Sequence, residues 1–527
     1  MNNFFSKKQA VYVKNGAVAT SEGLAAQAGL EILKKGGNAV DAAVATAACL
    51  TVVEPCSNGI GSDAFAIVYF QNKIYGLNAS GRSSRNISIE KVKNLKLDSM
   101  PKYGVIPINV PGAPKAWSRL IERFGNLSLI EVLEPAIKLA RDGYAIGHNV
   151  GYYFENAIKI YETMNHGEEY KHFFEVFKNG DSYYKAGDIF KNELIAKTLE
   201  EIGYTNSDSF YSGYLAEKID SFMKKHNGFI DKEDLKNYDV EFVEPLKINY
   251  KGYDILELPP NGQGITALMA LNILKNQDFD YRDYKTFHKQ IEALKIAFSD
   301  TMKYVTDPMF MKANPKYFLS DEYAKTRYNE IGEFAKIHEP IDYKSSGTVY
   351  LATADSMGNM VSFIQSNYMG FGSGIVIDDT GISMQNRGHT FSLDPNHHNC
   401  LMPNKKTYHT IIPGFLMKNN HAIGPFGVMG GFMQPQGHLQ VLMNMIDFNM
   451  DPQAALDAPR FRWDSQNNVA VEPLFPKSIT DSLISCGHNI TVEEKIGGFG
   501  NGQIILKKEN HYLVGSETRC QGHVAYY

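Results

Sequence analysis

The chain has 527 residues, of which 43% are hydrophobic and 21% charged, and its formal net charge is -5. This balance is ordinary for a soluble protein and, without any basic block, predicts no nucleic-acid partner. The longest apolar stretch, residues 39–53, falls short of the roughly 20 residues that a membrane span needs, so we expect no membrane segment. The N-terminal residues show no apolar core of signal-peptide length, which predicts a cytoplasmic protein.

Helices and strands are predicted in blocks along the first two thirds of the chain. Two helices are expected over residues 21–53, and a glycine-punctuated loop then leads into strands that extend to residue 77. Residues 117–146 are helical in pattern, and a Tyr- and Lys-rich region over 151–242 is typical of a helical cover. Strands return at 246–260, and two further helices follow them.

A hairpin that begins at Thr348 is the clearest pattern in the second half of the chain. Two alternating runs, residues 349–354 and 360–364, flank a turn at 355–359 that contains Gly358. In the intact chain, Thr348 is an ordinary β-branched residue at the start of a strand. If the preceding bond were cut, the same residue would carry a hydroxyl nucleophile and a free α-amine that could act as its general base.

Strands are also predicted over residues 381–384, 409–417 and 421–429, and an amphipathic helix follows the last of them. The chain from residue 468 onward is again strand, helix and strand. Antiparallel strands enclosed by helices predict a layered α+β architecture rather than alternating βαβ units.

We expect neither a metal nor a cofactor. His389, His397, His398, Cys400 and His409 lie close in sequence, but their spacing matches no zinc template. The five cysteines form no C-x-x-C pair and are typical of buried thiols in a reducing compartment rather than of a disulfide framework.

Several motifs follow one another through the chain: GGNAVDAAVATA, VVEPCSNGIG, PGAPKAW, ELPPNGQG, the hairpin GTVYLATADSMGNMVSFIQSNYMGFGSGI, and GPFGVMGGFMQPQGHLQV. Together they resemble the γ-glutamyltransferase, or glutathione hydrolase, family from about residue 19 to the end of the chain. The resemblance implies an N-terminal nucleophile hydrolase, which is an α+β protein with a four-layer αββα sandwich. It also implies a precursor that cuts itself between Gly347 and Thr348, giving a large chain of residues 1–347 and a small chain of residues 348–527 in one intertwined unit.

The resemblance assigns catalytic roles to four residues. Thr348 matches the nucleophile, and Ser366 matches a second hydroxyl close to it. Gly430 and Gly431 match the paired glycines whose N–H groups form the oxyanion hole. Glycine suits that position because the backbone must approach a tetrahedral centre without a Cβ in the way.

Three further residues match positions that bind the carboxylate of the acyl donor. Arg82 matches the arginine that holds the α-carboxylate, and Arg85 is a rival for the same role. His409 and Thr410 stand where two serines usually help to bind this carboxylate. A bidentate guanidinium is well suited to such a ligand.

Three departures from the family pattern concern the acyl group. Tyr368 replaces the usual asparagine that contacts the α-amino group, Thr390 replaces an acidic residue, and Arg387 replaces a glutamine. An α-ammonium would therefore lose an anionic partner and face a cation. By Coulomb's law, Arg387 favours a second carboxylate or a neutral acyl chain, as in the acylase-type branch that resembles glutaryl-cephalosporin acylases.

The resemblance thus predicts a self-processing amidohydrolase or acyltransferase that cleaves γ-glutamyl amides, such as glutathione, through an acyl-threonine. We expect hydrolysis to prevail over transpeptidation, since residues 391–409 are shorter than the lid loop of bacterial relatives. An acylase for dicarboxylic acyl amides is the alternative, and a non-enzymatic binding protein is a third hypothesis that the retained Thr348 disfavours. The expected partners are a small acyl amide and the two chains of one precursor, whose αβ unit could associate with further copies.

Overall fold

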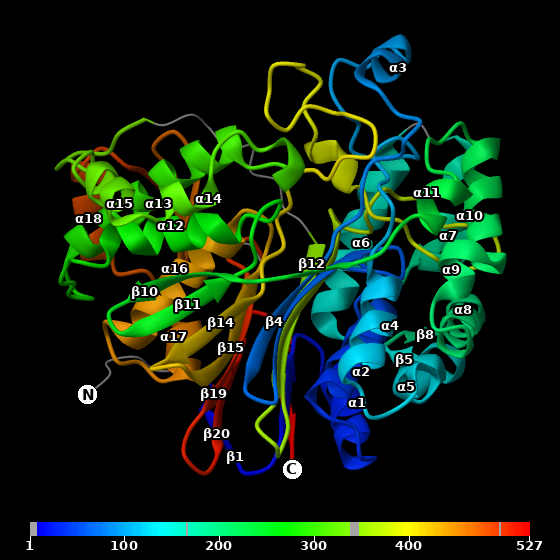
Figure 1. Ribbon diagram of the computed structural model, residues 1–527, viewed down its shortest axis with the longest axis horizontal. Helices are drawn as coiled ribbons and strands as arrows, with labels where there is room; N and C mark the ends of the chain where they lie inside the picture. Colours follow the sequence, from blue (N-terminus) through cyan, green and yellow to red (C-terminus); the bar gives the residue numbers. More distant parts are fainter. Residues whose placement is uncertain (1–7, 165–166, 338–346, 495–496) are drawn as a thin grey trace.

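The computed structural model describes residues 8–164, 167–337, 347–494 and 497–527, and its elements form four layers (Figure 1). Two antiparallel sheets lie face to face in the centre, and helices cover the outer face of each sheet. The predicted α+β, four-layer αββα sandwich is therefore confirmed. The proposed cleavage site lies at the edge of the described chain, because residues 338–346 fall outside the described residues.

The first sheet contains the predicted hairpin at its centre. In spatial order its strands are β21 (His523–Tyr526), β2 (Ala17–Thr20), β12 (Gly347–Ala354), β13 (Met360–Tyr368), β3 (Asp63–Phe70), β4 (Lys73–Ala79) and β9 (Glu241–Val243). The second sheet has the order β1 (Val11–Val13), β20 (Tyr512–Ser516), β19 (Asn501–Lys507), β15 (His421–Met429), β14 (Gly414–Lys418), β11 (Tyr253–Glu257) and β10 (Leu246–Tyr250). Three smaller groups of strands lie outside these two sheets. One is a sheet of β16 (Phe461–Ser465), β17 (Asn468–Val471) and β18 (Asn489–Val492). The others are two pairs, β5 (Tyr144–Ala145) with β8 (Ile189–Phe190) and β6 (Lys178–Asn179) with β7 (Ser182–Tyr183).

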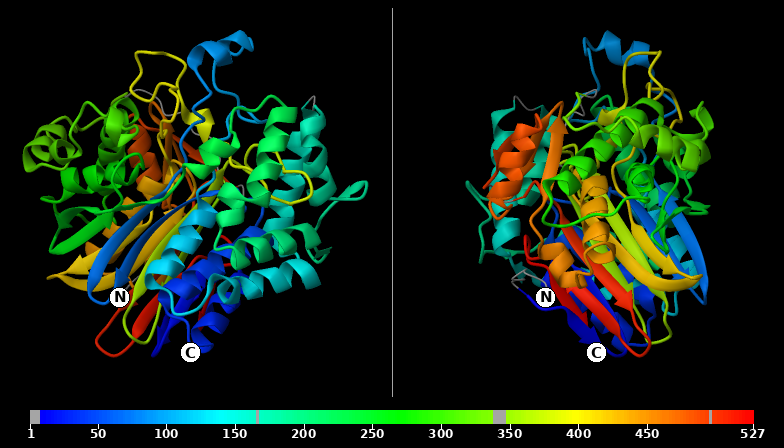
Figure 2. Two further views of the ribbon diagram at one scale, coloured as in Figure 1. Left: turned by 45° about the vertical axis from the view of Figure 1, so that its right-hand side comes forward. Right: turned by 90° about the vertical axis from the view of Figure 1, so that its left-hand side faces the viewer.

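Helices from the first half of the chain cover the first sheet (Figure 2). They are α1 (Gly23–Lys34), α2 (Ala39–Val53), α4 (Ala113–Phe124) and α5 (Leu129–Asp142), with α3 (Ile89–Asn94), α6 (His148–Thr163), α7 (Lys171–Phe177), α8 (Glu193–Tyr204), α9 (Asp208–Ser212), α10 (Tyr214–Lys225) and α11 (Lys232–Lys236) farther out. The other sheet is covered by α12 (Gly264–Leu274), α13 (Tyr284–Tyr304), α14 (Pro315–Phe318), α15 (Asp321–Tyr328), α16 (Met433–Ile446), α17 (Pro452–Asp457) and α18 (Lys477–Ser485). Among the described residues, no helix is long and apolar enough to cross a membrane.

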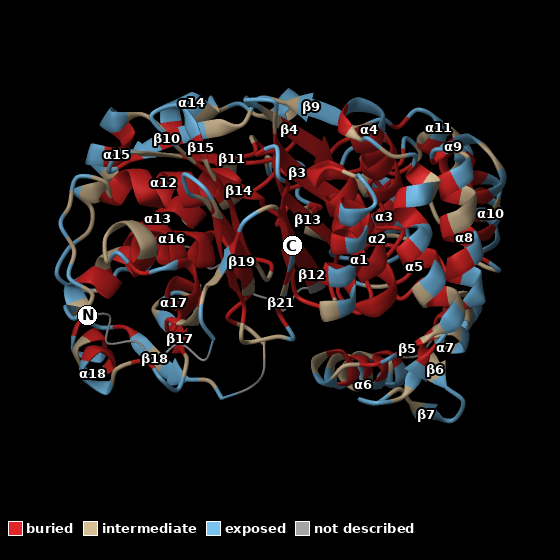
Figure 3. Ribbon diagram, turned by 90° about the horizontal axis from the view of Figure 1, so that it is seen from below, coloured by how far each residue is buried: buried red, intermediate tan, exposed pale blue. Residues whose placement is uncertain are grey.

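Side chains of β12 alternate between two separate cores, as the period of a strand requires. Val349 and Leu351 pack with the helices that cover the first sheet, whereas Tyr350 and Ala352 pack between the two sheets. Figure 3 shows the same result for the whole molecule, because buried residues fill both sheets and the helix faces that lie against them. A strand buried on both faces holds Thr348, its second residue, in a fixed place.

One predicted strand is shorter than expected. Residues 409–417 were expected to form one strand, but β14 begins only at Gly414. The backbone N–H of His409 donates to Asn261 and that of Ile412 donates to the side chain of Gln434, so these residues bond to separate segments instead of one strand. This irregular stretch is the part that carries two predicted site residues.

Candidate active site

The predicted nucleophile lies in a β-bulge at the start of the hairpin. The register of β12 and β13 shifts between Gly347 and Val349, so that Thr348 opposes two residues of β13. A bulge redirects the side chains next to it. One of the two opposing residues is Ser366, whose Oγ lies 3.0 Å from Oγ1 of Thr348, and both residues are buried. The structure thus brings the predicted nucleophile and the predicted second hydroxyl together.

Arg387 is a buried cation beside these two hydroxyl groups. Its Nη1 donates to Oγ1 of Thr410 at 2.7 Å, and its Nη2 lies 3.5 Å from Oγ of Ser366. The guanidinium carbon lies 4.4 Å from the ring centroid of Tyr368, a cation–π contact that further restrains the side chain. Burial lowers the pKa of Arg387 to about 10, so the group remains charged at neutral pH.

Asp63, at the start of β3, joins the site although sequence reasoning did not identify it. Its Oδ2 lies 3.0 Å from Nε2 of His409 and 3.6 Å from Nε of Arg387, and its Oδ1 accepts from the N–H of Gly81. Burial and the nearby Arg387 charge lower the pKa of His409 to about 4. At neutral pH the imidazole is therefore uncharged, and it donates its Nε2 proton to Asp63 while Nδ1 accepts from the N–H of Ile411.

Gly430 and Gly431 form the turn between β15 and α16. Their φ angles are 132° and 60°, in the region that favours glycine. In the part of the chain that the structure describes, neither N–H group donates a hydrogen bond, which leaves both donors for a ligand. Gln263, which sequence reasoning also missed, links this turn to the rest of the site, because its Nε2 donates to the carbonyls of Thr410 and Gly431 at 2.6 and 2.8 Å.

Arg82 is not brought into this cluster. Its guanidinium donates to Asp307 at 2.6 Å and to Glu241 at 3.3 Å, and within the described residues none of its bonds reaches Thr348 or Ser366. Two carboxylates already neutralise this arginine.

The rival arginine and the predicted Thr390 are also bonded to the protein itself. Arg85 is exposed and pairs with Asp231 at 2.7 Å. Thr390 donates to the backbone carbonyl of Arg387 at 2.8 Å and lies 2.7 Å from the hydroxyl of Thr407. Thr390 thus supports the short turn that bears Arg387 (η3, Arg387–Thr390).

The sequence predicts no metal site in the histidine-containing segment of residues 389–409. Among the described residues, this segment contributes no member to a group of possible metal ligands. A different set, His288, Glu292 and His488, places three donor atoms close together. Hydrogen bonds account for this set, since Nδ1 of His288 lies 2.9 Å from Nε2 of His488 and Glu292 bonds to Lys295 at 2.6 Å. A neighbouring ammonium group opposes a cation there.

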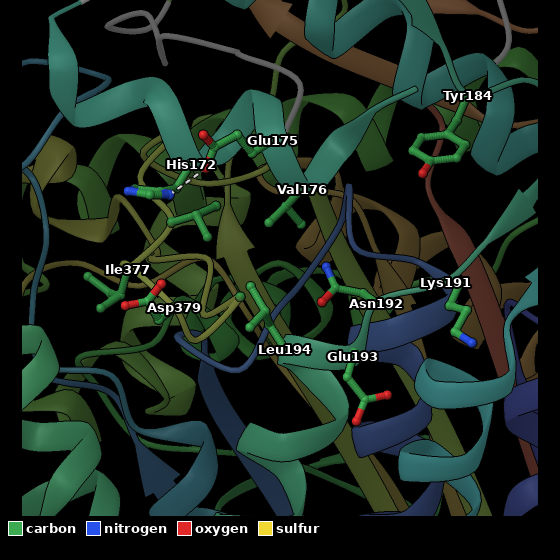
Figure 4. A pocket seen from close by; sticks show the side chains of 12 residues that line it. His172, Glu175, Val176, Tyr184, Lys191, Asn192, Glu193, Leu194, Ile377 and Asp379 are labelled. Atoms are coloured by element: carbon green, nitrogen blue, oxygen red, sulfur yellow. Dashed lines mark ion pairs between the residues drawn. The ribbon is translucent and has the colours of Figure 1, made fainter. Parts of the chain in front are cut away.

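A surface hollow of about 250 Å³ lies apart from the reacting groups (Figure 4). Figure 4 shows His172 and Glu175 of α7 on one side and Asn192 and Leu194 on the other. His172 is paired with Glu175 at 2.7 Å. The hollow has no lining residue in common with the cluster around Thr348, and residues from both sides of the proposed cut line it, such as Leu194 and Ile377.

A four-layer αββα sandwich with a buried threonine at the start of a central strand defines the class of N-terminal nucleophile hydrolases. The chain matches the family model of gamma-glutamyltranspeptidase over residues 25–527 and belongs to this family. The family resemblance that the sequence motifs predict is therefore confirmed.

Relatives within this family include both glutathione hydrolases and acylases. The chain is 36% identical to the glutathione hydrolase-like YwrD proenzyme of Bacillus subtilis, over 93% of this chain and 94% of that protein. It is 30% identical to the acylase ACY 1 proenzyme of Pseudomonas sp. strain SE83, over 94% and 91% of the two chains. The crystal structure of cephalosporin acylase from Bacillus halodurans is 53% identical, with a TM-score of 0.97 and coverage of 100% of this chain and 98% of that chain.

Proposed function

We propose that the protein is a self-processing amidohydrolase with Thr348 as its nucleophile. Cleavage of the bond between Gly347 and Thr348 would free an α-amine beside the threonine hydroxyl, and such an amine can serve as the general base. Support comes from the bulge that turns Oγ1 toward Ser366 and from relatives that are proenzymes. The products would be a large chain of residues 1–347 and a small chain of residues 348–527.

Processing is tested on denaturing gels. Purified wild-type protein is expected to give two bands, and N-terminal sequencing of the smaller one is expected to start at Thr348. The Thr348→Ala variant should give a single band and no amidase activity. Thr353→Ala is the matched control, because this buried threonine of β12 bonds to the carbonyl of Ala39 instead of to Ser366. A single band in an active wild-type preparation would refute the proposal.

In the proposed reaction, Oγ1 of Thr348 attacks the amide carbonyl while the α-amine takes the hydroxyl proton. The N–H groups of Gly430 and Gly431 stabilise the oxyanion, and loss of one such donor typically lowers the rate by about 10²–10³. The amide C–N bond then breaks, the leaving amine takes the proton from the α-ammonium, and an acyl-threonine ester remains. Water attacks this ester while the α-amine takes one of its protons. The ester C–O bond then breaks, Oγ1 of Thr348 takes the proton back from the α-ammonium, and the free acid leaves.

We infer further that the acyl group carries a carboxylate and no ammonium. Arg387 is the observation that supports this inference, since its charge is buried next to the nucleophile. Its Nη2 lies 3.5 Å from Oγ of Ser366, which lies 3.0 Å from Oγ1 of Thr348, so the two ends are at most about 6.5 Å apart. A carboxylate a few carbon atoms from the attacked carbonyl would meet this guanidinium. The site therefore fits dicarboxylic acyl amides such as glutaryl amides.

γ-Glutamyl compounds such as glutathione are the second candidate substrates. The chain is 30% identical to the glutathione hydrolase proenzyme of Escherichia coli, and the α-carboxylate of a glutamyl group would meet the same guanidinium. Its ammonium is less favoured, because Asp63 already accepts hydrogen bonds from His409 and Gly81 and adjoins the positive Arg387. With either acyl group, we propose that hydrolysis exceeds transfer to an acceptor amine.

The two acyl groups are compared as anilides on the processed protein. We expect kcat/KM for glutaryl anilide to exceed that for γ-glutamyl anilide by about tenfold or more, with the free acid as the main product when glycylglycine is present. Charged hydrogen bonds contribute about 1.5–3 kcal/mol, so Arg387→Met should lower kcat/KM for the glutaryl substrate by about 10- to 100-fold. Arg82→Met is the matched arginine control and should have a smaller effect. A preference of wild type for the γ-glutamyl anilide would favour the second candidate.

A further inference from the structure

We propose that Gln263 is a positioning residue that holds the oxyanion turn at Gly430–Gly431 in register with the acyl-binding residues Thr410 and Arg387. This inference rests on the proposed amidohydrolase function. Among the described residues, the hydrogen bonds of Gln263 reach neither Thr348 nor Arg387, so its role is to fix the backbone that contacts the substrate rather than to react with it.

The side-chain amide of Gln263 is fully buried, and both of its N–H donors and its carbonyl oxygen form hydrogen bonds. Nε2 donates to the carbonyls of Thr410 at 2.6 Å and of Gly431 at 2.8 Å, and Oε1 accepts from the hydroxyl of Tyr408 at 3.2 Å. The orientation of the amide follows from this network, since two backbone carbonyls can only accept. One residue therefore spans both halves of the site with three directed bonds.

Only one side of the oxyanion turn is fixed by its own helix. The carbonyl of Gly430 accepts from the N–H of Met433, and that of Gly431 accepts from the N–H of Gln434, which ties the turn to the start of α16. The bond from Gln263 approaches the Gly431 carbonyl from another element, because Gln263 lies directly before α12. Without this bond the turn is held by the start of α16 alone, so we expect the direction of its two N–H groups to change.

The acyl-binding side has additional supports that the Gln263 side chain does not provide. The backbone N–H of Gln263 donates to the carbonyl of His409 at 2.9 Å, and the N–H of His409 donates to Asn261 at 2.9 Å. A side-chain substitution at Gln263 leaves both of these backbone bonds in place. The expected loss therefore falls on oxyanion stabilisation, which acts in the transition state, more than on substrate binding.

The test is a comparison of kcat and KM for Gln263→Met, which keeps the length of the side chain but removes its polar atoms. We expect kcat per active site, counted by burst titration, to fall at least tenfold while KM changes less than threefold. Gln440→Met is the matched control. Gln440 is a buried residue of α16 whose side-chain amide also donates to two backbone carbonyls, those of Gln436 and Phe461, and neither belongs to the proposed site. Its kcat should remain within twofold of the wild-type value.

A second variant separates positioning from a general loss of packing. In Gln263→Glu, a protonated carboxyl can donate to one of the two carbonyls, whereas an ionised carboxylate repels both. The ratio of its kcat to that of wild type should therefore fall as the pH rises, while the ratio for Gln440→Glu stays constant.

The inference is overturned if Gln263→Met keeps the wild-type kcat or if its kcat falls no further than that of Gln440→Met. It is also overturned if the loss of kcat/KM comes from a higher KM instead of a lower kcat. The kcat ratio is measured with whichever anilide wild type hydrolyses faster, because the oxyanion is common to both. A wild-type protein that hydrolyses neither anilide would instead overturn the proposed function.

Discussion

Glu22 is a carboxyl group that the folded protein keeps in its neutral form. It is 8% exposed at the start of α1, and burial together with the charge of Glu54 raises its pKa from 4.5 to about 9. Between these two pH values the folded state holds a proton that the unfolded state has lost. The free energy of unfolding must therefore decrease as the pH rises through this range.

Replacement of Glu22 by glutamine should remove this dependence, because an amide has no proton to lose. We expect Glu22→Gln to leave Tm unchanged near pH 5 and to raise it relative to wild type near pH 9, as measured by thermal denaturation. Glu31→Gln is the matched control, since Glu31 lies exposed on the same helix in an ion pair with Lys35 at 2.8 Å. If Tm changes by the same amount between pH 5 and pH 9 in wild type and in Glu22→Gln, this explanation is wrong.

Sequence reasoning at the scale of single residues found the hydroxyl groups and the buried arginine but missed two of their neighbours. Ser366 is close to Thr348 because both lie in one hairpin, where register determines distance. Asp63 is the first residue of β3 and Gln263 directly precedes α12, and each follows a glycine-containing loop. Nothing in their local pattern indicates which distant residues they bond. The environment of Arg82 depends on Asp307, which is 225 positions away.

At the scale of elements, one carboxylate joins the catalytic hairpin to the helix that supports it. Oδ1 of Asp355, in the turn between β12 and β13, accepts from the N–H groups of Met357 and Asn359. Oδ2 accepts from the N–H of Ala39, the first residue of α2, at 3.0 Å. This helix also begins with a capping box between Asn38 and Asp41, so its N-terminus is fixed on both sides.

Removal of this link should lower the stability of the folded protein without changing the residues of the proposed active site. Asp355→Ala leaves the buried N–H groups of Ala39 and Asn359 unpaired, at a cost of about 1–3 kcal/mol for each, so we expect the free energy of unfolding to fall by roughly 2–6 kcal/mol. Denaturant unfolding of the Thr348→Ala background measures this change in a single uncut chain. Asp394→Ala is the control, because Asp394 caps a similar turn on an exposed loop and its loss should cost less than about 1 kcal/mol.

Most elements could be predicted because their periodicity is local. The hairpin and the two helices around Gly36 have the expected bounds to within a few residues. Residues 409–413 could not be predicted, since their apolar and β-branched pattern is typical of a strand while their bonds run to Asn261 and Gln434. Tertiary bonds of this kind override local propensity.

At the scale of the whole molecule, the first sheet interleaves the two proposed chains. β2, β3, β4 and β9 precede the proposed cut, whereas β12 from Thr348 onward, β13 and β21 follow it. β12 lies between β2 and β13, and β21 pairs with the other edge of β2. The order of the strands in space was not predictable from the sequence, because it depends on contacts between residues several hundred positions apart.

This interleaving gives the proposed cut a consequence for the lifetime of the enzyme. Before cleavage, refolding brings together segments of one polypeptide, so the entropic cost of bringing them together is that of closing loops. Afterwards the same sheet must assemble from two molecules, each of which exposes unpaired strand edges while it is alone. The mature protein then persists through the height of its unfolding barrier rather than through a reversible equilibrium, and each molecule that unfolds is permanently lost.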